Sequence, residues 1–286
     1  MNNLKNASIL KYGLMVIALS FVINVIYYMQ FKLDEPVFLK HYYEKDVYAG
    51  KYINLYLIDN KNDSRKISEA IFTQMPDDFA YITQSYIRNY VRGKFSPYSY
   101  NTLVIEFHCD ERGFEERGEE SITLDKVLIR YDNGDQQEVD IGKITLNKNM
   151  KHYEFFNNNY NSASNDYTSA TGMTAIKDIM IKDIGSTLEE EAKGIINFAL
   201  NDVKVEDLKY PINISSGEKL NFNNKFLFNS DDSRKYNAYE LQKRILISDS
   251  EGNDGYETIR NLNYDPLELF LSRKEITKYL KLRGIK

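Results

Sequence analysis

ITLDKVLIRYDNGDQQEVDIGKITL, residues 122–146, is the stretch that decides the fold class of this 286-residue chain. Two runs rich in alternating apolar and polar residues flank Asp132-Asn133-Gly134-Asp135. Asn-Gly suits a tight turn because both residues adopt positive φ at little cost, and alternation of period two is typical of a half-buried strand. The sequence therefore predicts a β-hairpin with strands over 122–131 and 137–146.

The same pattern recurs 118 positions further along the chain, where RILISDSEGN (244–253) aligns with KVLIRYDNGD (126–135). Apolar or glycine positions agree at one offset without a gap, and they continue beyond the turn as Ile141 with Ile259 and Ile144 with Leu262. Two unrelated hairpins would also share apolar triplets and a turn glycine. The constant offset favours an internal repeat, and hence two tandem β domains.

Further runs rich in Tyr, Ile, Val, Thr and Phe predict strands at 52–57, 67–75 and 101–109. The predicted fold class is mostly β: an N-terminal transmembrane helix, two tandem β-sandwich-like domains and a short C-terminal helix. We expect a first β domain at 47–156, a polar linker or loop at 157–174 (NNNYNSASNDYTSATGMT), and a second β domain with the C-terminal helix at 175–286. Residues 186–200 fit either a helix or a strand.

Residues 12–31, from Tyr12 to Phe31, run without a formal charge. At a rise of 1.5 Å per residue, about 20 residues span a hydrocarbon core of about 30 Å. A cleaved signal peptide is the rival interpretation, but its apolar region is shorter and ends in small residues, whereas YYMQF ends this run. No Cys follows the run, which excludes a lipoprotein anchor. We predict an uncleaved signal anchor that binds the lipid bilayer through 12–31.

The charges on the two sides of this anchor do not by themselves determine its orientation in the membrane. Lys5 and Lys11 precede it, and Lys32, Lys40 and Lys45 follow it among several acidic residues, so the positive-inside count is nearly even. The tail at 1–11 is short. The polar part of the chain, residues 32–286, has no paired thiols, and in this it resembles exported domains. We therefore expect a short cytoplasmic tail at 1–11, a juxtamembrane stalk at 32–46, and residues 32–286 outside the cytoplasm at the cell membrane.

The C-terminal residues predict an amphipathic helix. Ser272 and Glu275 have the spacing of a capping box, and Ile276, Tyr279 and Leu280 follow. The basic residues of this segment are Arg273, Lys274, Lys278, Lys281, Arg283 and Lys286. The helix either contacts a membrane surface or an acidic partner, or caps the last sheet with a solvated charged face, which is the simpler interpretation.

The sequence contains no recognisable catalytic constellation. His108 and Cys109 are adjacent, so a strand would direct them to opposite faces, and we expect Cys109 to be a small buried hydrophobe beside Asp110. Asp249, Glu251 and Asn253 resemble a calcium loop, but Asp254 and Arg260 occupy the positions of its Gly and Glu, so we predict a solvated turn. We expect no catalytic, cofactor-binding or metal-binding residues and no cofactor. The Asp231-Asp232 pair and the Glu189-Glu190-Glu191 run are predicted to be surface charge.

The overall composition narrows the class of function. A net charge of −5 and a pI near 5.5 argue against a nucleic-acid partner, and one Cys excludes an intramolecular disulfide framework. We expect a non-enzymatic interaction or accessory module of the cell envelope with a protein partner. The alternatives are a cell-wall or carbohydrate-binding module that uses some of the 23 Tyr, or a hydrolase that uses paired carboxylates.

Overall fold

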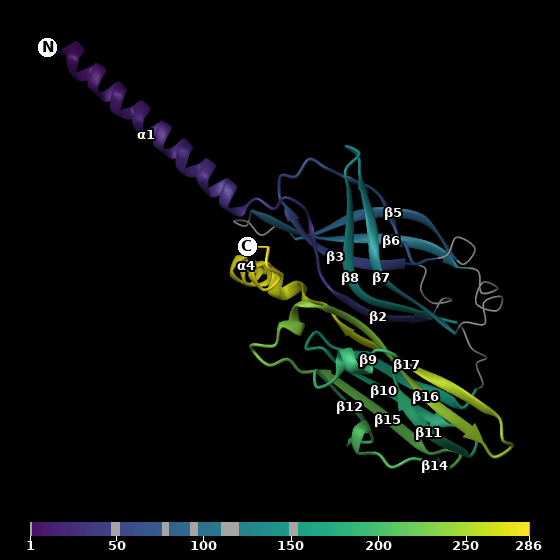
Figure 1. Ribbon diagram of the computed structural model, residues 1–286. Coiled ribbons are helices and arrows are strands. Elements are labelled where there is room, and N and C mark those ends of the chain that lie inside the picture. Colours follow the sequence, from purple (N-terminus) through teal and green to yellow (C-terminus); the bar gives the residue numbers. More distant parts are fainter. Residues whose placement is uncertain are drawn as a thin grey trace.

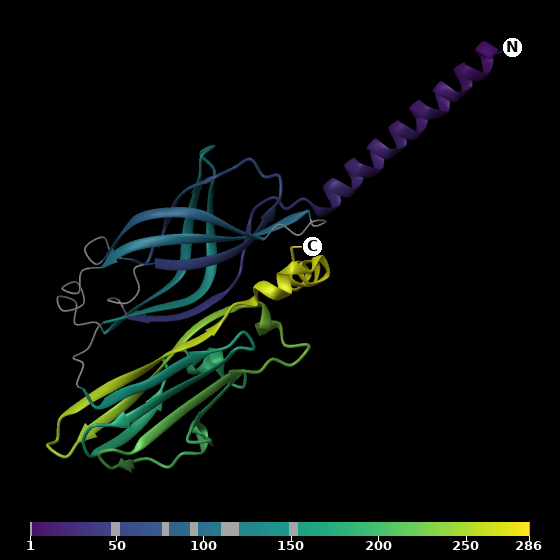
Figure 2. The same ribbon diagram turned by 180° about the vertical axis from the view of Figure 1, so that it is seen from behind.

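The computed structural model describes residues 2–46, 52–75, 80–91, 97–109, 120–148 and 154–285. Figure 1 shows one long helix, α1 (Asn2–Phe31), projecting from a body made of two stacks of β-strands. Figure 2 shows the same body from behind, with the short C-terminal helix beside the base of α1. The chain is mostly β, as predicted.

The first sandwich packs two sheets over one apolar core. Its core residues alternate along the strands, as in Ile53, Leu55 and Leu57, which face Val127 and Ile129 of the opposite sheet. One sheet has the order β1 (Val37–Phe38), β3 (Tyr52–Asn60), β6 (Tyr98–Cys109), β5 (Ala80–Val91). The other has the order β2 (His41–Asp46), β8 (Gln136–Asn147), β7 (Ser121–Tyr131), β4 (Ile67–Ile71).

The second sandwich has a separate core, which includes Phe198, Phe222, Ile245 and Ile247. Its first sheet contains β14 (Ile212–Ile214), β11 (Ile179–Gly185), β16 (Ala238–Asp249) and β17 (Asp254–Tyr264). Its second sheet has the order β13 (Val203–Lys204), β12 (Ile196–Leu200), β15 (Lys219–Phe226), β10 (Thr168–Ala175), β9 (Phe156–Ala163). Residues 186–200, left open by the sequence, form the short helix α3 (Glu189–Ala192) and then β12.

The two predicted hairpins are present, and they share one register. In β7–β8, Leu128 pairs with Glu138, and in β16–β17, Leu246 pairs with Tyr256, which is the same pair moved by 118 positions. The turn glycines Gly134 and Gly252 both have positive φ. The repeat seen in the sequence is therefore a repeat of strand pairing as well.

The predicted stalk at 32–46 is wrong. Residues 37–38 form the buried strand β1, which pairs with β3. Residues 41–46 form strand β2, which pairs in parallel with β8 on one side and with the first residues of β16 on the other. A single eight-stranded sheet thus runs through both sandwiches. The charged residues Glu44, Lys45 and Asp46 of β2 have their partners in the second sandwich, as described below.

The predicted linker at 157–174 is also wrong. These residues form β9 and most of β10, an antiparallel hairpin at the margin of the second sandwich. The segment is polar because β9 is an edge strand, with residues 157–163 all exposed, and an edge strand needs little apolar surface. Whether 47–156 and 175–286 fold independently stays a prediction.

The C-terminal helix α4 (Arg273–Leu282) forms where it was predicted, but it packs on both sandwiches. Ile276, Tyr279 and Leu280 join a third apolar cluster with Leu33 and Tyr98 of the first sandwich. The expected capping-box bond is not formed. Glu275 instead accepts a hydrogen bond from the Tyr236 hydroxyl at 2.6 Å, which ties α4 to the 3₁₀ turn η2 (Ser233–Tyr236). The other 3₁₀ turns are η1 (Val205–Asp207) and η3 (Pro266–Leu271).

Helix α1 contains the one stretch of the described chain, Lys11–Phe31, that is long and apolar enough to span a membrane. This stretch could be a membrane anchor or a signal sequence. Asn24 donates its amide to the Ser20 carbonyl at 2.8 Å, so the helix satisfies this polar group itself. Beyond the stretch, the Asn60 side chain bonds both the N–H and the carbonyl of Leu33, at 2.9 and 2.6 Å, and joins α1 to β3.

Candidate functional site

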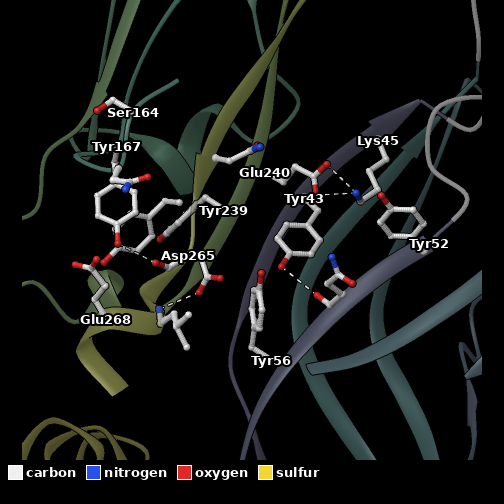
Figure 3. Close-up of a pocket in the computed structure, with 15 residues that line it drawn as sticks. Tyr43, Lys45, Tyr52, Tyr56, Ser164, Tyr167, Tyr239, Glu240, Asp265 and Glu268 are labelled. Carbon is white, nitrogen blue, oxygen red and sulfur yellow. Dashed lines mark hydrogen bonds and ion pairs between the residues drawn. The ribbon is translucent and has the colours of Figure 1, made fainter. Parts of the chain in front are cut away.

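A cavity between the two sandwiches has a volume of about 550 Å³. One wall comes from β2 and β3, with Tyr43, Tyr52 and Tyr56, and the other from β16, β17 and η3, with Asp265 and Glu268. Figure 3 shows the three tyrosines on one side and Asp265 and Glu268 on the other. The cavity exists because β2 joins the sheets of the two sandwiches at one place and leaves space beside the joint.

Most tyrosines that line this cleft between the two sandwiches are hydrogen-bonded to the backbone, so they stabilise the fold. The hydroxyl of Tyr43 donates to the Asn54 carbonyl at 3.1 Å, and that of Tyr264 donates to the Lys235 carbonyl at 2.7 Å. Burial raises the pKa of Tyr43 well above its usual value, so its phenol stays protonated. Tyr52 is different, because its side chain is 53% exposed. The ring surface that the cleft offers to a ligand therefore comes mainly from Tyr52.

An ion pair crosses the cleft wall from β2 to β16. Lys45 Nζ lies 2.7 Å from Oε1 and 2.6 Å from Oε2 of Glu240. Lys45 is nearly buried but the Glu240 side chain is 39% exposed, so solvent screens the pair in part, and the pair links the two strands.

Two carboxylates that line the cleft, Asp265 and Glu268, are relevant to the hypothesis of a hydrolase with paired carboxylates. Burial raises the pKa of Asp265 above its usual value, and Glu268 lines the same cavity. Asp265 accepts the Leu267 N–H at 2.9 Å, which caps η3, and the Tyr100 hydroxyl at 3.3 Å. Its hydrogen bonds give Asp265 a structural role at the start of η3.

Glu44 on β2 forms the most densely bonded contact between the two sandwiches. It is 1% exposed and accepts four hydrogen bonds. The donors are Ser186 Oγ at 2.7 Å, Thr187 N at 2.6 Å, Thr187 Oγ1 at 2.5 Å and Gln242 N at 3.0 Å. A buried carboxylate is tolerated only with such partners, so Glu44 acts as a latch from β2 onto the second sandwich.

His41 fixes the start of β2 in the first sandwich. Its Nε2 accepts the Tyr56 N–H at 2.8 Å, so the ring proton is on Nδ1, which lies 3.3 Å from the Ile141 carbonyl. Complete burial lowers the pKa of His41 from 6.5 to about 3, and the ring is therefore neutral. Gly142 lies opposite with φ +99°, and a Cβ there would be 2.4 Å from the His41 carbonyl oxygen.

A second candidate surface is the outer edge of β9. Among the described strands, β9 pairs only with β10, and its eight residues include no charged residue and no Pro. Ser164 donates its N–H to the Thr168 carbonyl at 2.9 Å. Because antiparallel ladders alternate, this bond directs the N–H groups of Ser162 toward β10 and those of Asn161 and Ala163 toward the open edge. β9 thus presents unpaired backbone groups to the surroundings.

The residues singled out in the sequence are dispersed. His108 is exposed on β6, while the side chain of Cys109 and all of Asp110 lie outside the described residues. Asp249 turns the second hairpin by accepting the N–H groups of Glu251 and Asn253 at 3.0 and 2.9 Å. Its hydrogen bond with Lys177 holds the pKa of Asp249 below its usual range. In the part of the chain that is described, no group of three His, Cys, Asp or Glu residues is placed to hold a metal ion.

The two acidic runs differ from the prediction of simple surface charge. Asp232 accepts the Arg234 N–H at 2.9 Å and pairs with its guanidinium, which closes the η2 turn. In the α3 run, Glu191 pairs with Lys143 of β8 at 2.9 Å, and Glu189 pairs with Lys243 of β16. α3 therefore contacts strands of both sandwiches.

Glu44, His41 and the open edge of β9 were missed in the sequence. A buried acid cannot be distinguished locally from a solvated one when its donors lie more than 140 residues away. Gly142, in the second strand of a predicted hairpin, was the one available local signal, because a strand glycine can mark a close backbone approach.

No protein-family model and no curated protein sequence matches the chain. Among solved structures, it is similar to the D00-D0 domain of intimin, with a TM-score of 0.22 and 11% identity over 79% of this chain and 98% of that one. It is also similar to the YadV chaperone (TM-score 0.17, 10% identity, 79% and 99% covered). Other similar structures are a marsupial T cell receptor (TM-score 0.20, 9% identity, 80% and 96% covered) and the MSCRAMM ACE of Enterococcus faecalis (TM-score 0.18, 9% identity, 80% and 93% covered). Similarities at this level assign neither a family nor a function.

Proposed function

We propose that this chain is a single-pass, membrane-anchored, extracytoplasmic module of the cell envelope that binds a protein partner without catalysing a reaction. The observation that carries the proposal is the open, uncharged edge of β9. An extended segment of the partner would add to this edge as a further strand. Backbone hydrogen bonds would supply affinity, and the exposed Asn, Ser and Tyr side chains would supply selectivity.

The attachment of α1 to the body supports an anchor that is retained. The Arg273 guanidinium lies 4.2 Å from the centre of the Phe31 ring and 5.1 Å from that of Tyr27. Leu33, directly after the helix, is 1% exposed in the third apolar cluster. The end of the helix is thus part of the folded body, and removing it would uncover apolar surface.

β9 lacks the charged residues and proline that normally protect an edge strand from pairing with another chain, which supports β9 as a binding edge. Exposed edge strands are normally protected from further pairing by Lys, Pro or a bulge. β9 has an irregularity opposite Gly172 and Met173, but its last residues pair regularly with β10. The stretch around Asn161 is therefore the best place for strand addition.

Paired substitutions at Asn161 test the edge. Asn161→Pro and Asn161→Ala both remove the side chain that accepts the Thr171 hydroxyl at 2.6 Å, but only Pro removes the outward N–H. A photo-crosslinking residue at exposed Ser162 should form a discrete protein adduct in intact cells. We expect that adduct in the Asn161→Ala background and its loss in Asn161→Pro. Equal adducts in the two backgrounds, or no adduct, would refute binding at this edge.

Cysteine labelling tests the orientation. In a Cys109→Ser background, Ser164→Cys in the exposed β9–β10 turn should react with a membrane-impermeant maleimide in intact cells. Asn3→Cys in the N-terminal tail should react only after the membrane is permeabilised. The reverse pattern would place the body in the cytoplasm and contradict the proposed orientation.

A carbohydrate ligand is the second candidate function, and the cleft favours it. Exposed Tyr52 lies in the same cavity as Asn54, Asn165 and the Lys45–Glu240 pair, which together offer a stacking ring and polar groups. Soluble cell-wall oligosaccharides should then bind the purified protein, and Tyr52→Ala should weaken binding at least tenfold in calorimetry. Tyr160→Ala, an exposed tyrosine on β9, is the control. Binding unaffected by Tyr52→Ala would eliminate the cleft as a sugar site.

A further inference from the structure

The C-terminal helix α4 lies at the membrane-facing end of the body. Figures 1 and 2, seen from opposite sides, both show it beside the base of α1. Arg273, the first residue of α4, contacts the rings of Tyr27 and Phe31, which belong to the last turn of the apolar stretch. If α1 spans a bilayer, α4 therefore begins within about one helical turn, roughly 5 Å, of the edge of the hydrocarbon core.

The outward face of α4 is basic. Ile276, Tyr279 and Leu280 are buried on the side toward the body. Lys274, Lys278 and Lys281 follow at spacings of four and three residues, which places them together on the opposite face, and all three are exposed. Within the described chain, none of these lysines forms an ion pair. Their charges are available to an external anion.

Apolar side chains flank the three lysines. Leu271 is 52% exposed, Leu282 is 54% exposed and Ile285 is 43% exposed. Leu282 is the last residue of α4, Leu271 ends η3 just before the helix, and Ile285 follows it. Lysines next to exposed apolar residues are typical of a segment that lies in the interface of a membrane.

The charge of this region contrasts with that of the body. Residues 273–285 contain five basic residues and one acidic residue, a net charge of +4, whereas residues 32–286 have a net charge of −7. The single acid, Glu275, is engaged by the Tyr236 hydroxyl. The body as a whole is repelled by an anionic bilayer, and α4 is the local exception.

We propose that α4 docks on the bilayer surface and binds anionic lipid headgroups. Lys274, Lys278 and Lys281 contact the phosphates, and Leu282 enters the boundary between headgroups and acyl chains. This inference rests on the proposed anchoring by α1. Docking would hold the two sandwiches at one fixed tilt, since α4 is also packed against both of them.

A tryptophan probe tests the docking, because the chain contains no Trp. Leu282→Trp replaces an exposed residue and is placed in the full-length protein, reconstituted in nanodiscs of phosphatidylcholine alone or with about one third phosphatidylglycerol. With lipids brominated near the headgroup, we expect at least a twofold loss of Trp fluorescence in the anionic nanodiscs. Replacing Lys274, Lys278 and Lys281 by Gln should abolish that loss.

Leu246→Trp is the matched control. Leu246 is similarly exposed (44%), and it lies eight strand residues beyond Ala238, about 26 Å along β16 from the α4 end of the molecule. It should not be quenched in either nanodisc. Quenching of both probes would indicate a collapsed protein and would overturn the proposed geometry.

Three other outcomes refute the proposal. No quenching at Leu282→Trp in protein that has inserted into the nanodisc would refute docking while leaving the α1 anchor intact. Equal quenching with and without anionic lipid, unchanged by the Gln substitutions, would refute recognition of anionic headgroups. Failure of the protein to enter nanodiscs at all would overturn the anchor itself, and the docking with it.

Discussion

Strands β2 and β9 lie in surroundings opposite to those that their compositions suggest, because the charged strand is buried and the uncharged strand is exposed. β2 (HYYEKD) has four charged or titratable groups besides its tyrosines, yet five of its six residues are buried. β9 (FNNNYNSA) has no charged residue, yet seven of its eight residues are exposed. The difference lies in their neighbours, since β2 pairs on both sides and β9 pairs on one.

The comparison shows how a charged strand is accommodated in the middle of a sheet. Each charge on β2 has a specific partner: Glu44 has its four donors, Lys45 has Glu240, and Asp46 has Arg260 at 2.9 Å. All three sets of partners belong to the second sandwich. The polar residues of β2 therefore specify which two sheets join, while β9 leaves its outer backbone groups unpaired among the described strands.

Removing the latch on β2 should have the largest effect. Glu44→Ala leaves the buried donors of Ser186, Thr187 and Gln242 without an acceptor, and we expect a loss of about 3–5 kcal/mol in the free energy of unfolding. Urea unfolding of the detergent-solubilised protein, followed by circular dichroism, measures this. Glu240→Gln, which breaks only a partly exposed pair, is the control, with about 1 kcal/mol or less expected. Equal losses would mean that Glu44 is not a latch.

The neutral histidine of β2 predicts a dependence of stability on pH. The pKa of His41 is about 3 in the fold and 6.5 in the unfolded chain, so between these values the unfolded state binds the additional proton. Stability contributed by neutral His41 is present above pH 6.5 and is lost as the pH falls toward 3, by about 2–4 kcal/mol. Unfolding free energies at several pH values measure the slope.

His41→Gln is the control for the pH dependence. Glutamine can accept the Tyr56 N–H and donate to the Ile141 carbonyl, but it does not titrate. We expect a shallower slope between pH 6.5 and 3 in this variant, whatever its stability at pH 7. An unchanged slope would assign the acid sensitivity to other groups.

The stability costs of two glycine substitutions test how closely β2 and β8 approach each other. Gly142 and Gly134 both have positive φ, but only at Gly142 does a new Cβ meet another residue, the His41 backbone. Gly134→Ala should cost about 1 kcal/mol for the backbone conformation alone, and Gly142→Ala about 1–3 kcal/mol more for the collision. Thermal or urea unfolding compares the two. Similar costs would contradict close packing at this crossing.

A charge on β9 should have the smallest effect on stability. Asn158→Lys changes an exposed residue of the edge strand, so the free energy of unfolding should change by about 0.5 kcal/mol or less. The same variant should reduce the adduct formed at Ser162, because lysine protects an edge strand from further pairing. A destabilisation well above 1 kcal/mol would show that β9 contributes to the core and is not an open edge.

The elements that the sequence predicted correctly have local causes. The hairpin at 122–146 follows from alternation and an Asn-Gly turn, α1 follows from an uncharged apolar run, and α4 follows from the spacing of Ile276, Tyr279 and Leu280. Two predictions were wrong, a stalk at 32–46 and a linker at 157–174, and the linker was predicted from the polar composition of its residues. Polarity of a strand instead reflects its place in the sheet.

Local pattern in the sequence by itself determined the apolar helix, the two hairpins with their common offset, and the β character of the body, because alternation and turn residues act over a few positions. Tertiary structure alone decided that β2 joins the two sandwiches, that Glu44 and His41 are buried, and that α4 lies beside α1. The physical reason is distance along the chain. The strands that flank β2 begin about 100 and 195 residues after it, and no local pattern shows which of them will supply the donors that a buried charge requires.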